Sequence, residues 1–431
     1  MEKNSKRRVV ITGMATINPL ADNLEDFYTN LINGKSGIRR WTSIDMSRVE
    51  CKIGGDLGHY DFTKALDNLR GRISEELHKK LRKLFRTCTF SNKAAMLCSI
   101  NAYLDAKLFG NHDDPFRTSV ITGGHNFNSV YITKNNKQFE AEPDFIDPLF
   151  GVEALDPNIP ASISEVLNVK GPTFTIGGAC ASGNLAIRDG FRDIVTGECD
   201  RSVVSGAIFD MTPADIQAMV MLNSVVVDPA LQNEPEKASR PFDADRCGFI
   251  PSHGAGAIIL EELETAKRRG AVIHAELLGV MANANANHVP APSSESQTRL
   301  MKDLLAHTGI KPEQVDYVNC HATSTPLGDL EELTAIKGAF GPHTKKLKLN
   351  APKSMLGHVC WSAPIVETIA GILQMKHGML HPSININKLD PAVDLDVCPN
   401  KAIAHKIRIM LKNSFGFGGI NCCSLIKEYE E

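Results

Sequence analysis

The sequence predicts an α/β protein built from two duplicated halves, each with a mixed β-sheet flanked by helices. Runs of β-branched and apolar residues alternate along the 431-residue chain with segments whose apolar residues recur at helical spacing. The order of elements also repeats, because a strand, Cys180 and a helix in the first half correspond to a strand, His358 and a helix in the second. This alternation favours layers of helices packed on sheets.

The first half is expected to span residues 1–268. Two polar stretches, 51–74 and 132–160, show no clear period and are expected to be irregular. Helices are expected near 24–32, within 74–108, directly after Cys180 and over 263–269. Strands are expected at 9–16, 119–124, 169–176, 200–208 and 254–261.

The second half is expected to span residues 269–431 and to contain a glycine-rich loop near 416–419. Helices are expected over 296–308 and 365–375. Strands are expected at 274–280, 315–322, from 347 towards His358, at 408–419 and at 422–426.

Composition excludes several classes of protein. A formal net charge of −3 gives no reason to expect nucleic acid or a membrane surface as a partner. The chain has no apolar run of transmembrane length, and residues 1–8 lead straight into a strand without a signal-peptide pattern. Eleven cysteines without C-x-x-C spacing indicate reduced thiols in a cytoplasmic protein, and no cluster has the spacing of a metal site.

Cys180 lies where a strand turns into a helix through small residues, in Gly177-Gly-Ala-Cys-Ala-Ser-Gly183. The unpaired N–H groups at a helix N-terminus stabilise a thiolate, so we expect the pKa of this thiol to be lowered. Small neighbours would let a substrate approach the sulfur. Alone, this stretch is equally compatible with a buried, inert cysteine.

A second candidate site is a basic stretch within the helical segment 74–108. It contains Lys79, Lys80, Arg82, Lys83 and Arg86. Such a charge run is either a solvated helix face or a docking site for an acidic partner, and the charges themselves do not decide between the two.

Motifs along nearly the whole chain resemble those of β-ketoacyl–acyl-carrier-protein synthases. They stand in the family's order: Cys180 in Gly-Gly-Ala-Cys-Ala-Ser-Gly, His321 in His-Ala-Thr-Ser-Thr-Pro-Leu-Gly-Asp, Lys353 and His358 in Lys-Ser-Met-Leu-Gly-His, and Asn413-Ser-Phe-Gly-Phe-Gly-Gly-Ile-Asn421. The resemblance implies a thiolase-like fold with α-β-α-β-α layers, usually a homodimer. It makes the inert-cysteine interpretation of Cys180 improbable.

The resemblance also implies a decarboxylative Claisen condensation. An acyl group would pass from the phosphopantetheine thiol of an acyl carrier protein to Cys180, and a malonyl group on a second carrier would lose CO₂ and attack it. The pathway would be of fatty-acid or polyketide type. No metal or bound cofactor is required, because the substrates arrive on phosphopantetheine.

By the same resemblance, His321 and His358 would donate hydrogen bonds to the extender's thioester carbonyl, where negative charge develops. The backbone N–H groups of Cys180 and Phe417 would form the oxyanion hole, and Phe417 would act as a mobile gate over the acyl pocket. Each histidine taken singly is better explained as a satisfied core residue, but both follow strand ends, as Cys180 does, and a shared pocket is the simpler account of the pair.

The remaining site residues are also implied by the resemblance. Lys353 would be a structural and electrostatic lysine with Glu332 as its partner. Thr323 and Thr325 would hold the phosphopantetheine arm, although capping of a local turn explains these hydroxyls nearly as well.

Since carrier proteins of these pathways are acidic, the resemblance favours the docking interpretation of the basic stretch. Arg82 and Lys83 match the position at which such synthases receive the carrier.

The sequence departs from the family pattern at Ala322, where glycine is usual, at Ser252-His253, where an acidic residue is usual, and at Trp361, where small residues are usual. These departures favour a specialised synthase and leave two alternatives open. One is a ketosynthase-fold acyltransferase or decarboxylase, and the other is a non-catalytic subunit of a heterodimer. A degradative thiolase would need a second reactive cysteine near the C-terminus; Cys422 and Cys423 lie there, but within the synthase-like pattern.

Overall fold

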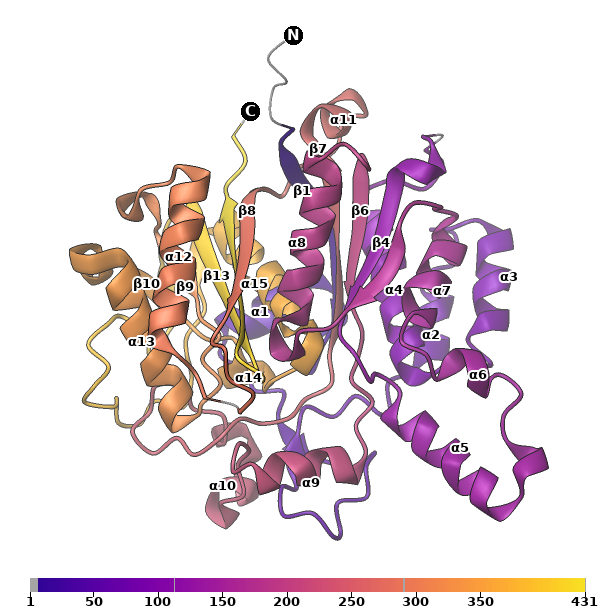
Figure 1. Cartoon of the computed structure of the whole chain (residues 1–431), viewed down its shortest axis with the longest axis horizontal. Coiled ribbons are helices and arrows are strands. Elements are labelled where there is room, and N and C mark those ends of the chain that lie inside the picture. The colour runs from indigo at the N-terminus through magenta and orange to yellow at the C-terminus, as the bar shows by residue number, and fades with distance from the viewer. Residues whose placement is uncertain (1–6, 112, 290, 431) are drawn as a thin grey trace.

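The computed structural model describes residues 7–111, 113–289 and 291–430, so most of the charged start of the chain lies outside the described residues. A ten-stranded mixed sheet runs through the molecule (Figure 1). Five strands come from the first half: β1 (Val9–Ile17), β4 (Thr118–Gly123), β5 (Thr173–Ile176), β6 (Arg201–Gly206) and β7 (Ala255–Glu262). Five come from the second: β8 (Ala275–Ala284), β9 (Tyr317–Asn319), β10 (Lys348–Asn350), β13 (Ile409–Gly416) and β14 (Ile420–Lys427).

The two halves of this sheet have the same topology. The first five strands lie in the order β5-β4-β6-β7-β1 and the second five in the order β10-β9-β13-β14-β8, which is 3-2-4-5-1 in chain order in both cases. In each half the second strand pairs in parallel with the third and fourth, and the fifth is antiparallel to both of its neighbours. The predicted duplication is therefore confirmed, whereas the boundary at 268/269 stays a prediction.

The two half-sheets are joined rather than separate. The first residues of β1, Val9–Ile11, pair on one side with β7 and on the other with β8, with Val9 opposite Leu277 and Ile11 opposite Ala275. Because β1 is buried along its whole length, its backbone groups at this point need partners on both edges. The pairing with β8 supplies them.

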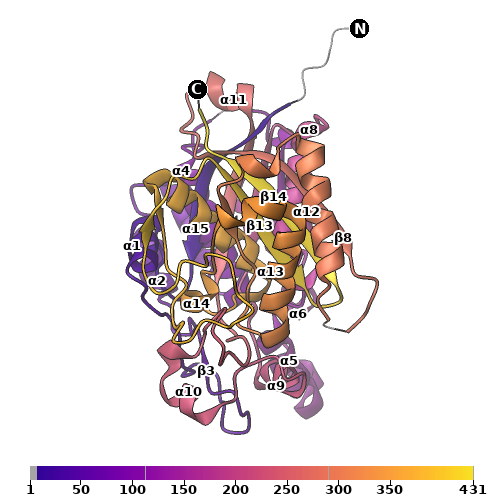
Figure 2. The same cartoon turned by 90° about the vertical axis from the view of Figure 1, so that its left-hand side faces the viewer.

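Helices form three layers around the two half-sheets (Figures 1 and 2). Between the half-sheets lie α8 (Ser182–Val195), which contacts strands of both halves, and α15 (Ala363–His377), which contacts β7 and β13. The outer face of the first half is covered by α4 (Phe90–Asp105) and α7 (Asn158–Leu167), and that of the second by α12 (Ser294–Thr308) and α13 (Pro326–Phe340). This is the predicted α-β-α-β-α arrangement.

The remaining elements are short or lie at the edges of the layers. No helix within the described ranges is long and apolar enough to cross a bilayer. The helices are α1 (Leu24–Ile32), α2 (Phe62–Asp67), α3 (Glu75–Leu84), α5 (Ser129–Ala141), α6 (Phe150–Glu153), α9 (Pro213–Met221), α10 (Pro229–Asn233), α11 (Leu263–Arg268) and α14 (Lys353–Leu356). The strands are β2 (Arg39–Arg40), β3 (Ile53–Gly54), β11 (Met379–Leu380) and β12 (Ile403–Ala404).

Side-chain caps define where several helices begin. Asn23, Ser74 and Thr89 each accept a hydrogen bond from a backbone N–H in the first turn of α1, α3 and α4. The cap at Thr89 separates two helices in the stretch 74–108, over which the sequence showed one helical pattern. Thr212 and Asp215 form a reciprocal capping box at the start of α9.

The prediction that residues 132–160 are irregular is wrong, because this stretch contains most of α5, the whole of α6 and the start of α7. These helices are fixed by individual polar contacts rather than by a regular apolar period. Asn135 donates to the carbonyl of Tyr131 and accepts from the N–H of Asp147 (3.0 and 2.9 Å), which ties α5 to the following turn. Asp156 accepts from the N–H groups of Asn126 and Phe127.

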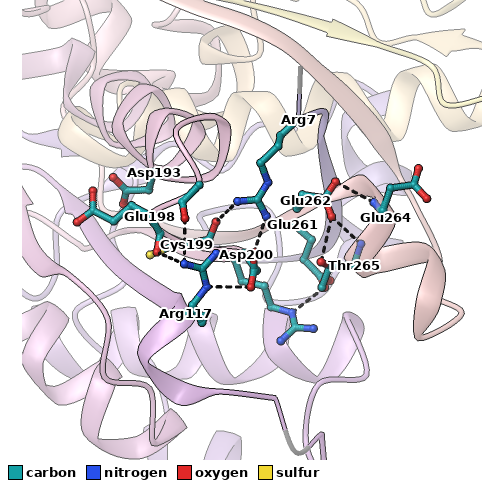
Figure 3. Close-up of polar contacts among 12 residues, drawn as sticks. Arg7, Arg117, Asp193, Glu198, Cys199, Asp200, Glu261, Glu262, Glu264 and Thr265 are labelled. Carbon is teal, nitrogen blue, oxygen red and sulfur yellow. Dashed lines mark hydrogen bonds and ion pairs between the residues drawn. The ribbon is translucent and has the colours of Figure 1, made fainter. Parts of the chain in front are cut away.

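An ionic cluster fixes the amino ends of β4 and β6 (Figure 3). Asp200 pairs with Arg7 and with Arg117, whose Nη2 lies 2.9 Å from its carboxylate. Hydrogen bonds from Arg117 and Arg7 lower the pKa of Asp200 to about 2. In the same region Glu262 caps α11 by accepting from the N–H and hydroxyl of Thr265 (Figure 3). The carboxyl ends of these strands, at the opposite edge, are where the candidate site forms.

Candidate active site

Cys180 lies in a single 3₁₀ turn, Ala179–Ala181, between the end of β5 and the start of α8. The end of β13 packs directly against this turn, and a Cβ on Gly416 would lie 2.6 Å from the carbonyl oxygen of Gly178. Only glycine permits that approach. The backbone N–H groups of Phe417 and Cys180 both favour the thiolate form of the Cys180 sulfur. These are the two groups that the family resemblance assigns to an oxyanion hole.

The predicted lowering of the Cys180 pKa is wrong. Burial of the sulfur raises the pKa of the Cys180 thiol to about 12, although the Lys353 ammonium and the two backbone N–H groups act in the opposite direction. The thiol therefore carries its proton at neutral pH in the free protein. It must lose that proton as the sulfur forms its covalent bond to the arriving acyl group.

His321 and His358 meet although they lie on different segments, after β9 and after α14. Their ring centroids are 5.5 Å apart and the rings are nearly perpendicular, at 83°. His358 is 2% exposed, and neither of its ring nitrogens bonds to any described residue. Burial, reinforced by the Lys353 ammonium, holds the pKa of both imidazoles well below the ordinary value. Both rings are neutral at physiological pH, so each has one N–H to donate.

A cavity of about 280 Å³ contains Cys180 and both histidines. The amide side chains of Asn285, Gln297 and Asn421 form part of its wall, and the Oε1 atom of the buried Gln297 has no partner among the described residues. The predicted site residues that line it are Cys180, His321, Thr323, Thr325, His358 and Phe417. The two threonine hydroxyls bond to each other at 3.1 Å.

Lys353 does not line this cavity, and its predicted pairing with Glu332 is wrong. Its Nζ lies 2.5 Å from Oε1 of Glu367, while Nζ of Lys412 lies 2.7 Å from Oε2 of the same carboxylate. All three side chains are at most 1% exposed. Three buried charges from α14, α15 and β13 thus share one ionic cluster, the Lys353–Glu367–Lys412 triad.

Glu332 has a different contact set. Its carboxylate accepts hydrogen bonds from the backbone N–H groups of His321 and Ala322 (2.8 and 2.7 Å) and from Nδ2 of Asn413 (2.9 Å). It therefore holds the backbone that presents the His321 imidazole, and it does so from α13. Because these donors already satisfy the carboxylate, a lysine partner is not needed.

Sequence reasoning missed Glu367 and Lys412. A detectable signal was present, since Glu367 stands in an otherwise apolar stretch of α15 and Lys412 in the apolar start of β13. Ionisable residues at such positions are buried when the element is buried on all sides, and burial demands a partner of opposite charge.

Two residues that depart from the family pattern lie outside the cavity lining. His253 is buried between Trp41 and Phe90, with ring centroids at 4.9 and 5.4 Å, and its Nδ1 accepts from the N–H of Leu57. Trp361 packs beside the Cys180 turn, against His125.

The proposed docking residues Arg82 and Lys83 are exposed near the end of α3 and do not line the cavity. In Figure 1 this helix lies at the edge of the molecule farthest from α13, whose first turn borders the cavity. Their role stays a prediction. The described residues contain no group of three or more side chains suited to hold a metal ion.

A thiol beside two backbone N–H groups, faced by two neutral imidazoles, suits transfer of an acyl group through a cysteine thioester. Together with two α/β halves of equal topology, this places the chain among thiolase-like acyltransferases. The β-ketoacyl synthase N-terminal and C-terminal domain families match residues 6–266 and 274–387. The chain belongs to the β-ketoacyl synthase family.

Individual relatives match this chain along nearly their full length. The chain is 35% identical to 3-oxoacyl-(acyl-carrier-protein) synthase 2 of Coxiella burnetii, covering 96% of this chain and 97% of that one. It is 33% identical to the enzyme of the same name from Synechocystis sp., covering all of both chains. Among solved structures, a type II polyketide synthase ketosynthase in complex with its acyl-carrier protein superposes with a TM-score of 0.85 at 26% identity, covering 99% of this chain and 100% of that one.

Proposed function

We propose that this protein condenses an acyl group held on Cys180 with a malonyl group on an acyl carrier protein, releasing CO₂ and a β-ketoacyl carrier. The observation that carries the proposal is the shared cavity, which brings one nucleophile, two N–H donors for an oxyanion and two neutral imidazoles together. Each of these groups has a distinct task in the two half-reactions.

In the first half-reaction the Cys180 sulfur attacks the carbonyl carbon of the incoming acyl thioester. The oxygen gains negative charge, and the backbone N–H groups of Cys180 and Phe417 stabilise it. The bond to the carrier sulfur then breaks, and the proton lost by the Cys180 thiol ends on the carrier thiol. The acyl group remains as a thioester on Cys180.

In the second half-reaction the malonyl carboxylate leaves as CO₂, and its electron pair forms an enolate on the carrier thioester. The N–H groups of His321 and His358 stabilise that enolate oxygen, whereas a carboxylate in their place would repel it. The enolate carbon then forms the new carbon–carbon bond to the acyl carbonyl. The bond to the Cys180 sulfur breaks, and one proton from solvent restores the thiol.

Replacing His321 or His358 with alanine tests this division of labour. We expect each variant to acquire the acyl group on Cys180 at a rate close to that of the wild type, and to condense it with malonyl carrier about 10²–10³-fold more slowly, the usual effect of losing one donor to a developing oxyanion. Intact-protein mass follows the first step, and mass analysis of the carrier follows the second.

His253→Ala is the matched control, because this histidine is as buried as His358 but lies outside the cavity. The condensation rate of this variant should lie within about threefold of the wild-type rate, because the substitution is remote from the reacting atoms. A wild-type chain that gains the acyl group and never condenses it would favour the decarboxylase or acyltransferase alternative. A chain that never gains it would favour the non-catalytic subunit.

We infer that the carrier docks on the basic side of α3, with Arg82 and Lys83 facing its acidic surface. Charge attraction of this kind speeds encounter and weakens with salt. The solved ketosynthase–carrier complex supports a carrier protein as the partner. Eleven free cysteines support a reducing, cytoplasmic location. The chemistry uses the carrier's phosphopantetheine and no further cofactor.

We also infer a homodimer. β5 pairs with β4 on one edge, and its other edge pairs with no described strand, although its residues are half-buried. Large apolar side chains are also exposed elsewhere in the first half, among them Phe116 (62%), Phe139 (58%) and Phe145 (68%). Sedimentation should give twice the chain mass of 47.0 kDa, and a single-chain mass at micromolar concentration would contradict the dimer.

A further inference from the structure

Three aromatic side chains from separate segments stack beside the Cys180 turn. The Trp361 ring lies 4.3 Å from that of His125 and 5.2 Å from that of Phe209, with tilts of 30° and 32°. We call these three residues the aromatic stack. Trp361 belongs to the 3₁₀ turn Cys360–Ser362, which contacts the turn that holds Cys180.

The stack is tightly held against the backbone next to the nucleophile. A Cβ on Gly124 would lie 3.0 Å from Cβ of Trp361, and one on Gly177 would lie 3.3 Å from the His125 ring. Cys360 has a φ of 49°, a left-handed conformation that directs the chain so that the indole enters this space. Phe209 closes the far side and is 6% exposed. The volume beside the cysteine turn is therefore filled by side chains.

The cavity that holds Cys180 opens in another direction. Its lining comes from the histidines, the two threonines, the amide wall and Phe417, and none of the three stack residues contributes to it. The incoming carrier arm must use this cavity, because it is the space that leads to the sulfur and to both imidazoles. An acyl chain attached to Cys180 has to be stored elsewhere while the malonyl carrier enters, and the stack occupies the adjacent volume.

We propose that Trp361 sets the upper length of the acyl group that Cys180 accepts, and that the wild-type enzyme uses short acyl groups. The inference rests on the proposed condensing function and concerns only its specificity. Removing the indole frees the space between the rings of His125 and Phe209, which suits an extended hydrocarbon chain.

The size of the effect follows from the burial of methylene groups. Each methylene moved from water into an apolar pocket is worth about fourfold in affinity. Three or four methylenes that fit only when the indole is absent therefore correspond to an expected change of about 10²-fold in the preference for a long over a short chain. The long-chain acyl group gains this advantage in the acylation step itself.

The test compares acetyl and decanoyl carrier thioesters as acyl donors for Cys180, with intact-protein mass as the readout. For the wild type we expect decanoyl transfer at least tenfold slower than acetyl transfer. Trp361→Ala should raise the decanoyl-to-acetyl ratio by at least tenfold, and Trp361→Leu should raise it by less. Trp361→Leu also covers the case in which the alanine variant does not fold.

Trp41→Ala is the control, because Trp41 is the other tryptophan of the chain, is buried in the same apolar cluster as Phe209 and Trp361, and packs its ring on His253 rather than on a ring of the stack. The decanoyl-to-acetyl ratio of this variant should equal that of the wild type. The inference is overturned if the wild type takes decanoyl as fast as acetyl, or if neither Trp361 variant changes the ratio. Failure of the wild type to take acetyl at all would instead overturn the proposed function, so the two failures are distinct.

Discussion

A Cys180→Ala variant is expected to gain no acyl group when it is mixed with an acyl-carrier thioester, whereas the wild type gains the mass of one. Condensation should fall by a factor on the order of 10⁴ or more, the scale that follows removal of a catalytic nucleophile. The reason is geometric, since Cys180 is the cysteine that lines the cavity with both imidazoles and receives two backbone N–H groups. Intact-protein mass before and after addition of malonyl carrier measures both steps.

Cys422→Ala is the matched control. Cys422 is fully buried in β14 and packs in the core with α8 and α15 rather than in the cavity. This variant should acylate and condense within about threefold of the wild type. An acyl adduct on the Cys180→Ala chain, or loss of condensation in the Cys422→Ala chain, would contradict the assignment; the second result would revive a thiolase-like use of two cysteines.

Replacing Glu367 with leucine is expected to lower the free energy of unfolding by about 3–5 kcal/mol, the cost of removing one partner from a buried ion pair. The carboxylate is the shared counter-charge of Lys353 and Lys412, and all three side chains are at most 1% exposed. Without it two ammonium groups would be left in the core without a negative partner. Denaturant-induced unfolding of the wild type and variant measures the difference.

Two further variants sharpen this test. Glu264→Gln breaks an exposed ion pair, in which the side chain of Lys267 is 47% accessible and that of Glu264 is 66% accessible. This variant should change the free energy of unfolding by less than about 1 kcal/mol. A triple replacement of Lys353, Glu367 and Lys412 by apolar residues should recover much of the loss, because no buried charge then remains. If Glu367→Leu is as stable as the wild type, the triad is not a closed ionic cluster.

Much of the fold could be predicted because it depends on patterns that extend over many residues. The buried strands are rich in β-branched and apolar residues, and α1 spans the predicted residues 24–32. The helices α5 and α6 could not be predicted in this way. Single contacts such as that between Asn135 and the N–H of Asp147 fix them, and such contacts leave no period in the sequence.

The same distinction, between long patterns and single contacts, holds for the residues of the site. Cys180, His321 and His358 follow the ends of strands, so their convergence is implied by the topology. The partner of Lys353 is not, because the choice between Glu332 and Glu367 depends on which of two helices turns a carboxylate towards it. The pKa of Cys180 escaped prediction for a related reason, since sequence indicates a helix N-terminus but not how far the sulfur is removed from water.

The equal strand order of the two halves also bears on the origin of the site. Cys180 and His358 both follow the third strand of their half, and His125 and His321 both stand two residues beyond the second strand. A half-length ancestor paired with a copy of itself would have presented each of these positions twice, in two identical catalytic centres. In a single chain the two copies of each position are free to differ, so that one third-strand position holds the electron-pair donor and the other a hydrogen-bond donor. A chain of this kind has one asymmetric centre in place of two identical ones, and its chemistry is directional.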